Sequence, residues 1–120
     1  MRALFILSLL PGLLLAAPAA LAHAFLSRSS PAVGSTVHQP PSELRLWFTE
    51  ELEGAFSTAE VTDAGDRSVV AGPVQVDPGN HQLMIVPLKP LTSGRYHVKW
   101  HALSVDTHTT TGTFTFEVAP

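Results

Sequence analysis

Single-residue alternation of apolar and polar side chains limits the folds available to this chain more than any other feature. Side chains of a strand point alternately to the two faces of a sheet, so this alternation predicts half-buried strands. It occurs in residues 43–49, 81–87, 96–102 and 111–118. The apolar faces that it predicts are Leu44, Leu46 and Phe48; Leu83 and Ile85; Tyr96, Val98, Trp100 and Ala102; and Phe114, Phe116 and Val118.

Turn-forming residues separate these segments, and no segment has helical spacing over a normal helix length. Clusters of Pro, Gly, Asn, Asp and Ser occur at 30–35, 39–42, 63–66, 77–80 and 92–94. Short strands joined by close turns predict an all-β fold, either an antiparallel sandwich or a Greek-key barrel. The chain has no cysteine, which excludes disulfides, thiolate metal sites and thiol catalysis.

Residues 1–22 are typical of a secretory signal peptide. One basic residue, Arg2, precedes an apolar run over residues 3–17, and Ala20-Leu21-Ala22 forms a small-residue cleavage signature. The alternative is a transmembrane anchor, but the run is shorter than the roughly 20 residues of a spanning helix, and Pro11-Gly12 interrupts it. We therefore predict a leader, 1–22, and one exported domain, 23–120, whose first residue is His23.

The charge of the chain argues against several classes of partner. Its formal net charge is −3, and the only basic residue of the leader is Arg2, so the exported domain is more acidic still. This charge gives no electrostatic footprint for nucleic acid or an anionic membrane. No other apolar run is long enough to span a bilayer, so we expect a domain that is not membrane-embedded, and we expect it to be a monomer.

Three residues predict a metal site. An N-terminal histidine can chelate one metal through its amine and its imidazole Nδ1, and cleavage before His23 creates such a residue. Asp106 and His108 are two positions apart, so on extended backbone they point to the same side. Together they offer three nitrogens and one oxygen. This donor set is typical of tetragonal Cu(II), although zinc would accept the same residues in a tetrahedral arrangement.

Each of these residues also has a structural interpretation. His23 is the first residue of a chain whose terminus can fray, and Asp106 can form a turn by bonding its own backbone. His108 can be an ordinary polar residue at a strand entrance. His97 and His101 are a weaker metal candidate, because four residues of strand hold them about 13 Å apart. We interpret those two as part of a solvated face.

The same residues resemble a known family, the copper resistance protein CopC family. The resemblance spans the exported domain and is carried by residues 23–26, 30–32, 44–50, 96–100, 104–108 and 112–116. It implies a periplasmic, cupredoxin-like Greek-key β-sandwich that holds one Cu(II). The implied ligands are the amine and imidazole of His23, with Asp106 and His108, and Glu50 would support them from beside the metal. An inner-membrane copper permease is the implied partner.

Three positions depart from the pattern of that family. A methionine-rich Cu(I) site has no counterpart, because Met84 is the one methionine after residue 22 and falls in a predicted strand. Phe25 replaces a histidine that is common at the third exported position. Thr107 replaces the glycine that usually follows the motif aspartate, so the local turn should be reshaped. We therefore expect a site for Cu(II) alone.

The predicted function is a non-enzymatic, periplasmic carrier or buffer of copper in copper homeostasis or resistance. One alternative is a copper-dependent oxidative enzyme resembling a lytic polysaccharide monooxygenase, which also uses an N-terminal histidine. Against it, Asp106 would occupy the position that oxygen needs, and two Trp and one Tyr give no flat aromatic surface for a glycan. The other alternative is an exported sandwich that binds partners without a metal.

Overall fold

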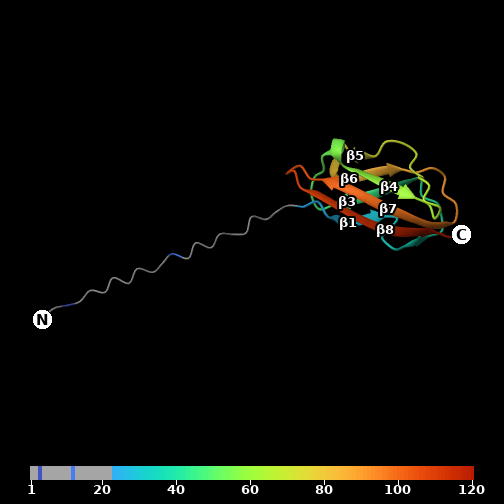
Figure 1. The fold of residues 1–120 in the computed structure, drawn as a ribbon, viewed down its shortest axis with the longest axis horizontal. Helices are drawn as coiled ribbons and strands as arrows, with labels where there is room; N and C mark the ends of the chain where they lie inside the picture. The colour runs from blue at the N-terminus through green and yellow to red at the C-terminus, as the bar shows by residue number, and fades with distance from the viewer. Residues whose placement is uncertain (1–2, 4–11, 13–22) are drawn as a thin grey trace.

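The structure, a computed structural model, describes Ala3, Gly12 and residues 23–120. The predicted leader is therefore outside the described residues apart from two isolated positions. Two four-stranded sheets form the domain, in the orders β1-β3-β6-β5 and β2-β8-β7-β4 (Figure 1). The strands are β1 (Leu26–Ser30), β2 (Thr36–Val37), β3 (Glu43–Phe48), β4 (Thr58–Thr62), β5 (Gln75–Asp77), β6 (Asn80–Pro87), β7 (Gly94–Leu103) and β8 (Thr109–Val118).

This arrangement confirms the predicted all-β sandwich. The one helical element of the described chain is a single 3-10 turn, η1 (Gly54–Phe56). Strand pairing is antiparallel except between β2 and β8, which run parallel over two residues. The alternation of polar and apolar residues cannot distinguish the two directions, because both types of strand expose side chains with the same period.

The core forms where the two sheets face each other, and most of the predicted apolar faces lie in it. All of the residues predicted to face inward on β3, β7 and β8 are buried. Phe48 of one sheet packs edge to face against Trp100 of the other, with ring centroids 5.2 Å apart. Aromatic contacts of this geometry add to the stabilisation from burial alone. Packing of the two sheets thus fixes the strand ends from which the loops of the molecule emerge.

The prediction for β6 was wrong in its phase. Met84 and Val86 face the core and are fully buried, whereas Ile85 lies on the outer face. Directly opposed residues of an antiparallel pair share a face, and Met84 and Val86 oppose Leu46 and Leu44 of β3. Four consecutive apolar residues, 83–86, carry no phase of their own, so the neighbouring strand decides it. Leu83 is buried as well, on the outer side opposite Trp47.

Candidate metal centre

Asp106 and His108 lie in the tight connection between β7 and β8, not on extended backbone as predicted. The amide of Thr107 donates to the carbonyl of Ser104 at 2.9 Å, and the amide of Ser104 donates to the carbonyl of His108 at 3.0 Å. Thr107 closes this turn with a φ of 74°. Such a left-handed conformation favours glycine, so threonine is strained here. The two side chains still converge, because the turn brings them to one side.

Ser104 organises this turn from inside the protein. It is fully buried, and its hydroxyl donates to Oδ1 of Asp106. The Oγ of Ser104 also accepts the amide of His108 at 3.3 Å and lies 3.2 Å from the carbonyl oxygen of His108. The Ser104 hydroxyl is the main reason that the pKa of Asp106 lies below its ordinary value, with desolvation opposing and His108 adding to the effect. Asp106 therefore stays ionised to a lower pH than an ordinary aspartate.

His108 places one ring nitrogen where it has no good partner in the described structure. Its Nδ1 lies 3.3 Å from Oδ1 of Asp106, close enough for electrostatic attraction. The same atom is buried and has no hydrogen bond of acceptable geometry. The distance and the missing bond agree if the two atoms are close but poorly aligned, since hydrogen bonds weaken steeply with angle. Buried polar atoms without partners are rare, and an absent ion is one common reason.

Residues 23–25 are held on two sides, by a residue that follows β3 and by a residue of β8, the strand that follows this turn. Oγ1 of Thr49 donates to the carbonyl of His23 at 3.0 Å and accepts the amide of Phe25 at 3.0 Å. Oγ1 of Thr110, at the start of β8, donates to the carbonyl of Ala24 at 2.5 Å. The imidazole rings of His23 and His108 consequently lie edge to face, with centroids 4.7 Å apart. Three of the predicted site residues, His23, Asp106 and His108, thus lie at one end of the sandwich.

In the full chain, the predicted donor atoms do not yet form a complete metal site. Among residues 23–120 no three His, Asp or Glu side chains already form a metal-binding group. In the full chain, the backbone nitrogen of His23 is part of the peptide bond to residue 22 and is not an amine. Two imidazoles in contact, one of them with an unpartnered Nδ1, and one carboxylate are nevertheless three donors of the kind that Cu(II) or Zn(II) takes. Cleavage before His23 would add a fourth donor at the same place.

Glu50 follows Thr49 at this end of the sandwich, but in the described residues it makes no recorded contact with the other predicted site residues. Within the described part of the protein, no hydrogen bond or ion pair joins its carboxylate to His23, Asp106 or His108. The supporting contacts come instead from Thr49 and Ser104, which sequence reasoning missed. A serine two residues before an aspartate is a known local signal for a side-chain-closed turn. Thr49 had no such signal, because its partners lie more than twenty residues away.

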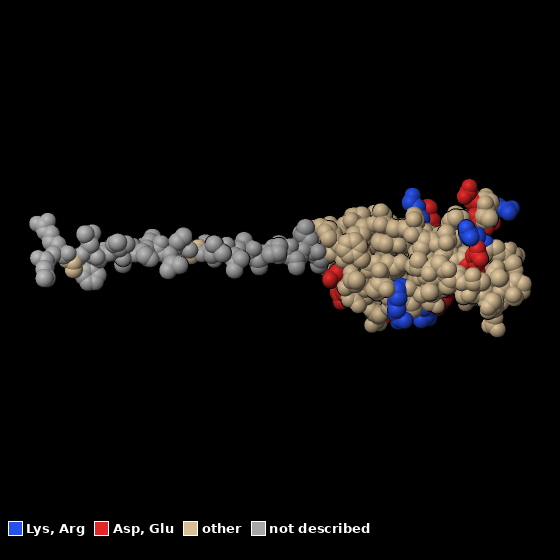
Figure 2. Space-filling model, turned by 90° about the horizontal axis from the view of Figure 1, so that it is seen from below, with Lys and Arg blue, Asp and Glu red and all other residues tan. Residues whose placement is uncertain are grey.

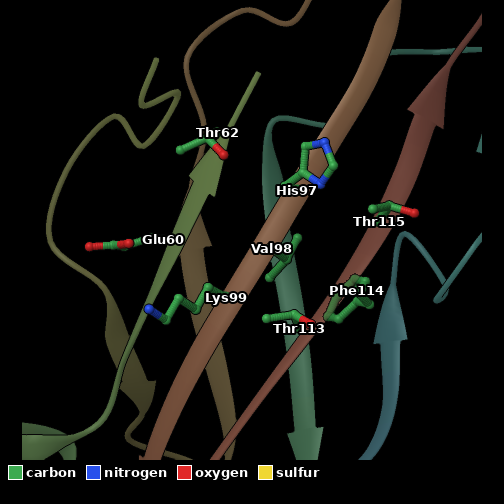
Figure 3. A pocket seen from close by; sticks show the side chains of 8 residues that line it. All are labelled: Glu60, Thr62, His97, Val98, Lys99, Thr113, Phe114 and Thr115. Atoms are coloured by element: carbon green, nitrogen blue, oxygen red, sulfur yellow. The ribbon is translucent and has the colours of Figure 1, made fainter. Parts of the chain in front are cut away.

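Among the described residues, no hydrogen bond, ion pair or ring contact joins another histidine to His23, Asp106 or His108. His97 lies on the open face of the β2-β8-β7-β4 sheet, where a shallow groove of about 370 Å³ runs over β4, β7 and β8. Figure 3 shows its polar side chains spread along three strands rather than converging on one point. His101 bonds the carbonyl of Phe56 at 3.2 Å, and His38 bonds that of Ala119 at 3.0 Å. The interpretation of His97 and His101 as parts of a surface, not a metal site, fits this geometry.

Comparison with known proteins agrees with the fold. Residues 26–119 match the family model of the CopC domain. Copper resistance protein C of Pseudomonas syringae pv. tomato is 36% identical over 123 aligned positions, covering 98% of this chain and 96% of that protein. In the described residues, no helix is long and apolar enough to cross a membrane.

Two crystal structures are similar along almost their whole length. CopC from Methylosinus trichosporium OB3b superposes with a TM-score of 0.76 at 30% identity, covering 82% of this chain and 95% of that one. PcoC from Escherichia coli, described as a methionine-rich copper resistance protein, superposes with a TM-score of 0.72 at 35% identity, covering 82% and 100%. The sandwich is thus the Greek-key fold that these proteins have. On the family match and this degree of identity, the chain belongs to the CopC family.

Proposed function

We propose that this protein is a periplasmic Cu(II)-binding protein that carries or buffers copper without catalysing a reaction. One Cu(II) per chain would be held by the amine and imidazole of His23, the imidazole of His108 and the carboxylate of Asp106. The proposal depends on one observation above all. Rings from opposite ends of the described chain lie with centroids 4.7 Å apart, beside a buried nitrogen of His108 that has no partner.

Two further observations support copper over another metal. Relatives that match nearly the whole chain are named for copper resistance. Nitrogen-rich donors with one carboxylate oxygen favour tetragonal Cu(II), which heads the affinity order of divalent metals. Met84 is fully buried in the core, so the exported domain offers no accessible thioether for Cu(I). We therefore propose a Cu(II)-only site, unlike that of a protein described as methionine-rich.

The residues around the donors would position them before the ion arrives. Ser104 keeps Asp106 ionised to a lower pH than an ordinary aspartate, and Thr49 and Thr110 hold the backbone on either side of His23. Supporting contacts of this kind typically raise metal affinity by a factor of about 10–100. Glu50 is proposed as a further support beside the metal, on the resemblance to the CopC family alone.

Export and cleavage are part of the same proposal. The leader pattern in residues 1–22 supports transfer to the periplasm and cleavage before His23. A monomer would suffice, since all the proposed donors come from one chain. The resemblance to the CopC family suggests an inner-membrane copper permease as the partner that receives or supplies the ion.

Copper titration of the processed protein tests the proposal. The protein is exported by its own host, and mass spectrometry verifies that it begins at His23. We expect one Cu(II) per chain, with an electron paramagnetic resonance spectrum of nitrogen-rich tetragonal coordination. A matched sample with one alanine added before His23 should bind far more weakly. Equal binding by the two samples would contradict the proposed role of the amine.

Two simple measurements separate the alternatives. Copper should raise the unfolding temperature of the processed protein, because a ligand that binds only the folded state stabilises it. An exported sandwich without a metal site would show no such shift. With ascorbate and a polysaccharide, the copper-loaded protein should not consume oxygen beyond free copper controls, whereas an oxidative enzyme would.

A further inference from the structure

Phe25 is a large apolar residue that the fold leaves mostly in solvent. It follows His23 by two positions and is 57% exposed. The aromatic rings of the core pack against one another instead, as Phe48 packs against Trp100. Because a side chain stabilises the fold in proportion to the apolar area that it buries, Phe25 contributes little to the core. Packing of the two sheets therefore does not explain a phenylalanine at this position.

The ring of Phe25 lies against the imidazole of His23. Their centroids are 5.8 Å apart, and the two ring planes are inclined by 57°. The imidazole of His23 also contacts that of His108, with centroids 4.7 Å apart. Tilted aromatic pairs at such distances attract each other beyond the effect of burial. Two neighbouring rings thus restrict the directions in which the imidazole of His23 can point.

The backbone of Phe25 is fixed by Thr49. The amide of Phe25 donates to Oγ1 of Thr49 at 3.0 Å, and its carbonyl accepts the amide of Thr49 at 2.8 Å. Ala24 is fully buried, and Oγ1 of Thr110 donates to its carbonyl. All of these contacts lie on the C-terminal side of the bond that precedes His23, so cleavage of that bond leaves them in place. The ring of Phe25 is thus attached to a fixed point, whereas the first residue of a chain frays unless a contact holds it.

The charged side chains of the described residues leave the ring of Phe25 to His23. A guanidinium can stack on an aromatic ring, and Arg28 does so over Trp47, with 3.8 Å to the ring centroid. In the face that Figure 2 shows, the surface where the described domain begins is uncharged or acidic, and the Lys and Arg side chains lie farther along the sandwich. Among residues 23–120, the recorded ring contact of Phe25 is therefore with His23, not with a cation.

We propose that Phe25 is a positioning residue for His23, the first ligand of the proposed copper site. Its ring holds the imidazole of His23 beside His108, so less conformational freedom is lost when Cu(II) binds. The same contact opposes the outward swing of His23 with which copper release begins. We therefore expect Phe25 to act chiefly on the dissociation rate of copper. This inference rests on the proposed copper function, and Phe25 itself touches no ion in it.

Release of Cu(II) from the processed protein to an excess of chelator, followed by stopped flow, tests this inference. Phe25→Ala should raise the dissociation rate roughly three- to tenfold, from the usual strength of an aromatic pair. Phe25→Tyr keeps the ring and should release copper at the rate of the unmodified protein. The matched control is Phe56→Ala, because Phe56 is 66% exposed and has no recorded ring contact with His23 in the described chain. This control should leave the rate unchanged.

A second measurement follows the imidazole of His23 in the metal-free processed protein. The ring current of Phe25 should displace the chemical shifts of the His23 ring protons. Phe25→Leu keeps an apolar side chain but removes the ring current, so at the same pH these shifts should move toward those of an unstructured histidine. The unfolding midpoints of the metal-free variants should stay within about 4 °C of the unmodified protein, since substitutions at exposed positions have small effects.

The outcomes separate this inference from the proposed function. If the processed protein binds copper and Phe25→Ala releases it no faster, the positioning role is wrong and the copper site stands. Equal acceleration by Phe56→Ala, or His23 shifts that Phe25→Leu leaves unchanged, would also overturn the positioning role. A markedly lower unfolding midpoint of metal-free Phe25→Ala would mean that Phe25 supports the fold instead. If the processed protein binds no copper, the proposed function fails, and this inference fails with it.

Discussion

Two regions along β7 and β8 carry histidines, and only one of them brings imidazoles together. His97 and His101 lie on the same face of β7, where the rise of a strand holds positions four residues apart at about 13 Å. His23 and His108 lie at the end of the same strands, with ring centroids 4.7 Å apart. Regular strand geometry separates side chains by a fixed step, whereas a turn and a crossing segment can place them in contact.

The largest expected effect is on copper binding, and it tests whether copper selects the His23–His108 end over the open sheet face. His108→Ala should remove a ligand and weaken Cu(II) binding by more than the roughly 10–100-fold that loss of a supporting residue costs. His97→Ala removes the same side chain from the open sheet face and should leave affinity unchanged. Competition with a calibrated copper chelator measures both. A loss in His97→Ala alone would place copper on the sheet face instead, and equal losses would mean that copper does not select the end of the sandwich.

The pairing of β7 with β8 supports both regions, and Gly112 is its most constrained position. A Cβ at Gly112 would overlap the indole ring of Trp100, which lies opposite it on β7. Gly112→Ala should therefore destabilise the fold by about 1–3 kcal/mol, because overpacked cores must shift to make room. Thermal unfolding should show a lower midpoint by at least about 4 °C. Thr113→Ala, at the exposed next position, should change the midpoint little.

The hydroxyl of Ser104 holds the turn at the site end through two hydrogen bonds. Ser104→Ala removes the donor to Asp106 and the acceptor for the His108 amide, at a cost of about 1 kcal/mol. The pKa of Asp106 should rise toward its ordinary value, since this hydroxyl is the largest cause of its lowering. Carboxyl chemical shifts followed against pH in the metal-free protein measure the change. An unaltered titration would mean that other contacts hold the turn.

Alternation predicted the scaffold well because it reports a property that each strand has alone. The inward faces of β3, β7 and β8 followed from it, since polar residues between the apolar ones fix the phase, with Trp47 of β3 as the exception. It failed for β6, where the run Leu83-Met84-Ile85-Val86 has no polar member. Pairing with β3 supplied the missing phase, and pairing is not visible in one segment of sequence.

The site was predicted in part, for a similar reason. His23, Asp106 and His108 could be singled out because few residue types bind metals, and the structure brings them to one end of the sandwich, while their binding of a metal stays a prediction. The extended geometry expected of Asp106 and His108 was wrong. Thr107 closes a turn that the spacing of Asp106 and His108 alone did not reveal. Thr49 and Thr110 hold the His23 segment through contacts between residues far apart in the sequence, which no local pattern encodes.

A substitution at Thr107 should have a smaller effect, and in the opposite direction, because it should raise the stability of the fold. A β-branched residue with a φ of 74° is strained, at a cost of about 1–2 kcal/mol relative to glycine. Thr107→Gly should recover about 0.5–1 kcal/mol of this, after the greater freedom of glycine in the unfolded chain is subtracted. Thr109→Gly, in the neighbouring strand β8, should instead destabilise the fold by about 0.5–1 kcal/mol. Chemical denaturation compares the pair.

The smallest expected effect compares two carboxylates, Asp63 and Asp106. Backbone amides of Arg67 and Gly65 bond Asp63, and mainly through the Arg67 amide they hold its pKa below the ordinary 3.8. A lowered pKa means that the anion stabilises the fold above pH 3.8 and that this contribution disappears as pH falls through the folded value. Asp63→Ala and the unmodified protein should therefore differ less in stability in strong acid than at neutral pH.

Copper distinguishes the two carboxylates further. If Asp106 is a ligand, Cu(II) should broaden or remove its carboxyl resonance, whereas that of Asp63, in the turn after β4, should keep its position and its midpoint. The turn at Asp63 is held by backbone amides and needs no ion, while the turn at Asp106 leaves a buried nitrogen of His108 without a partner. Equal broadening of both resonances would mean that copper binds surface carboxylates without selectivity. The unpartnered nitrogen would then need another explanation.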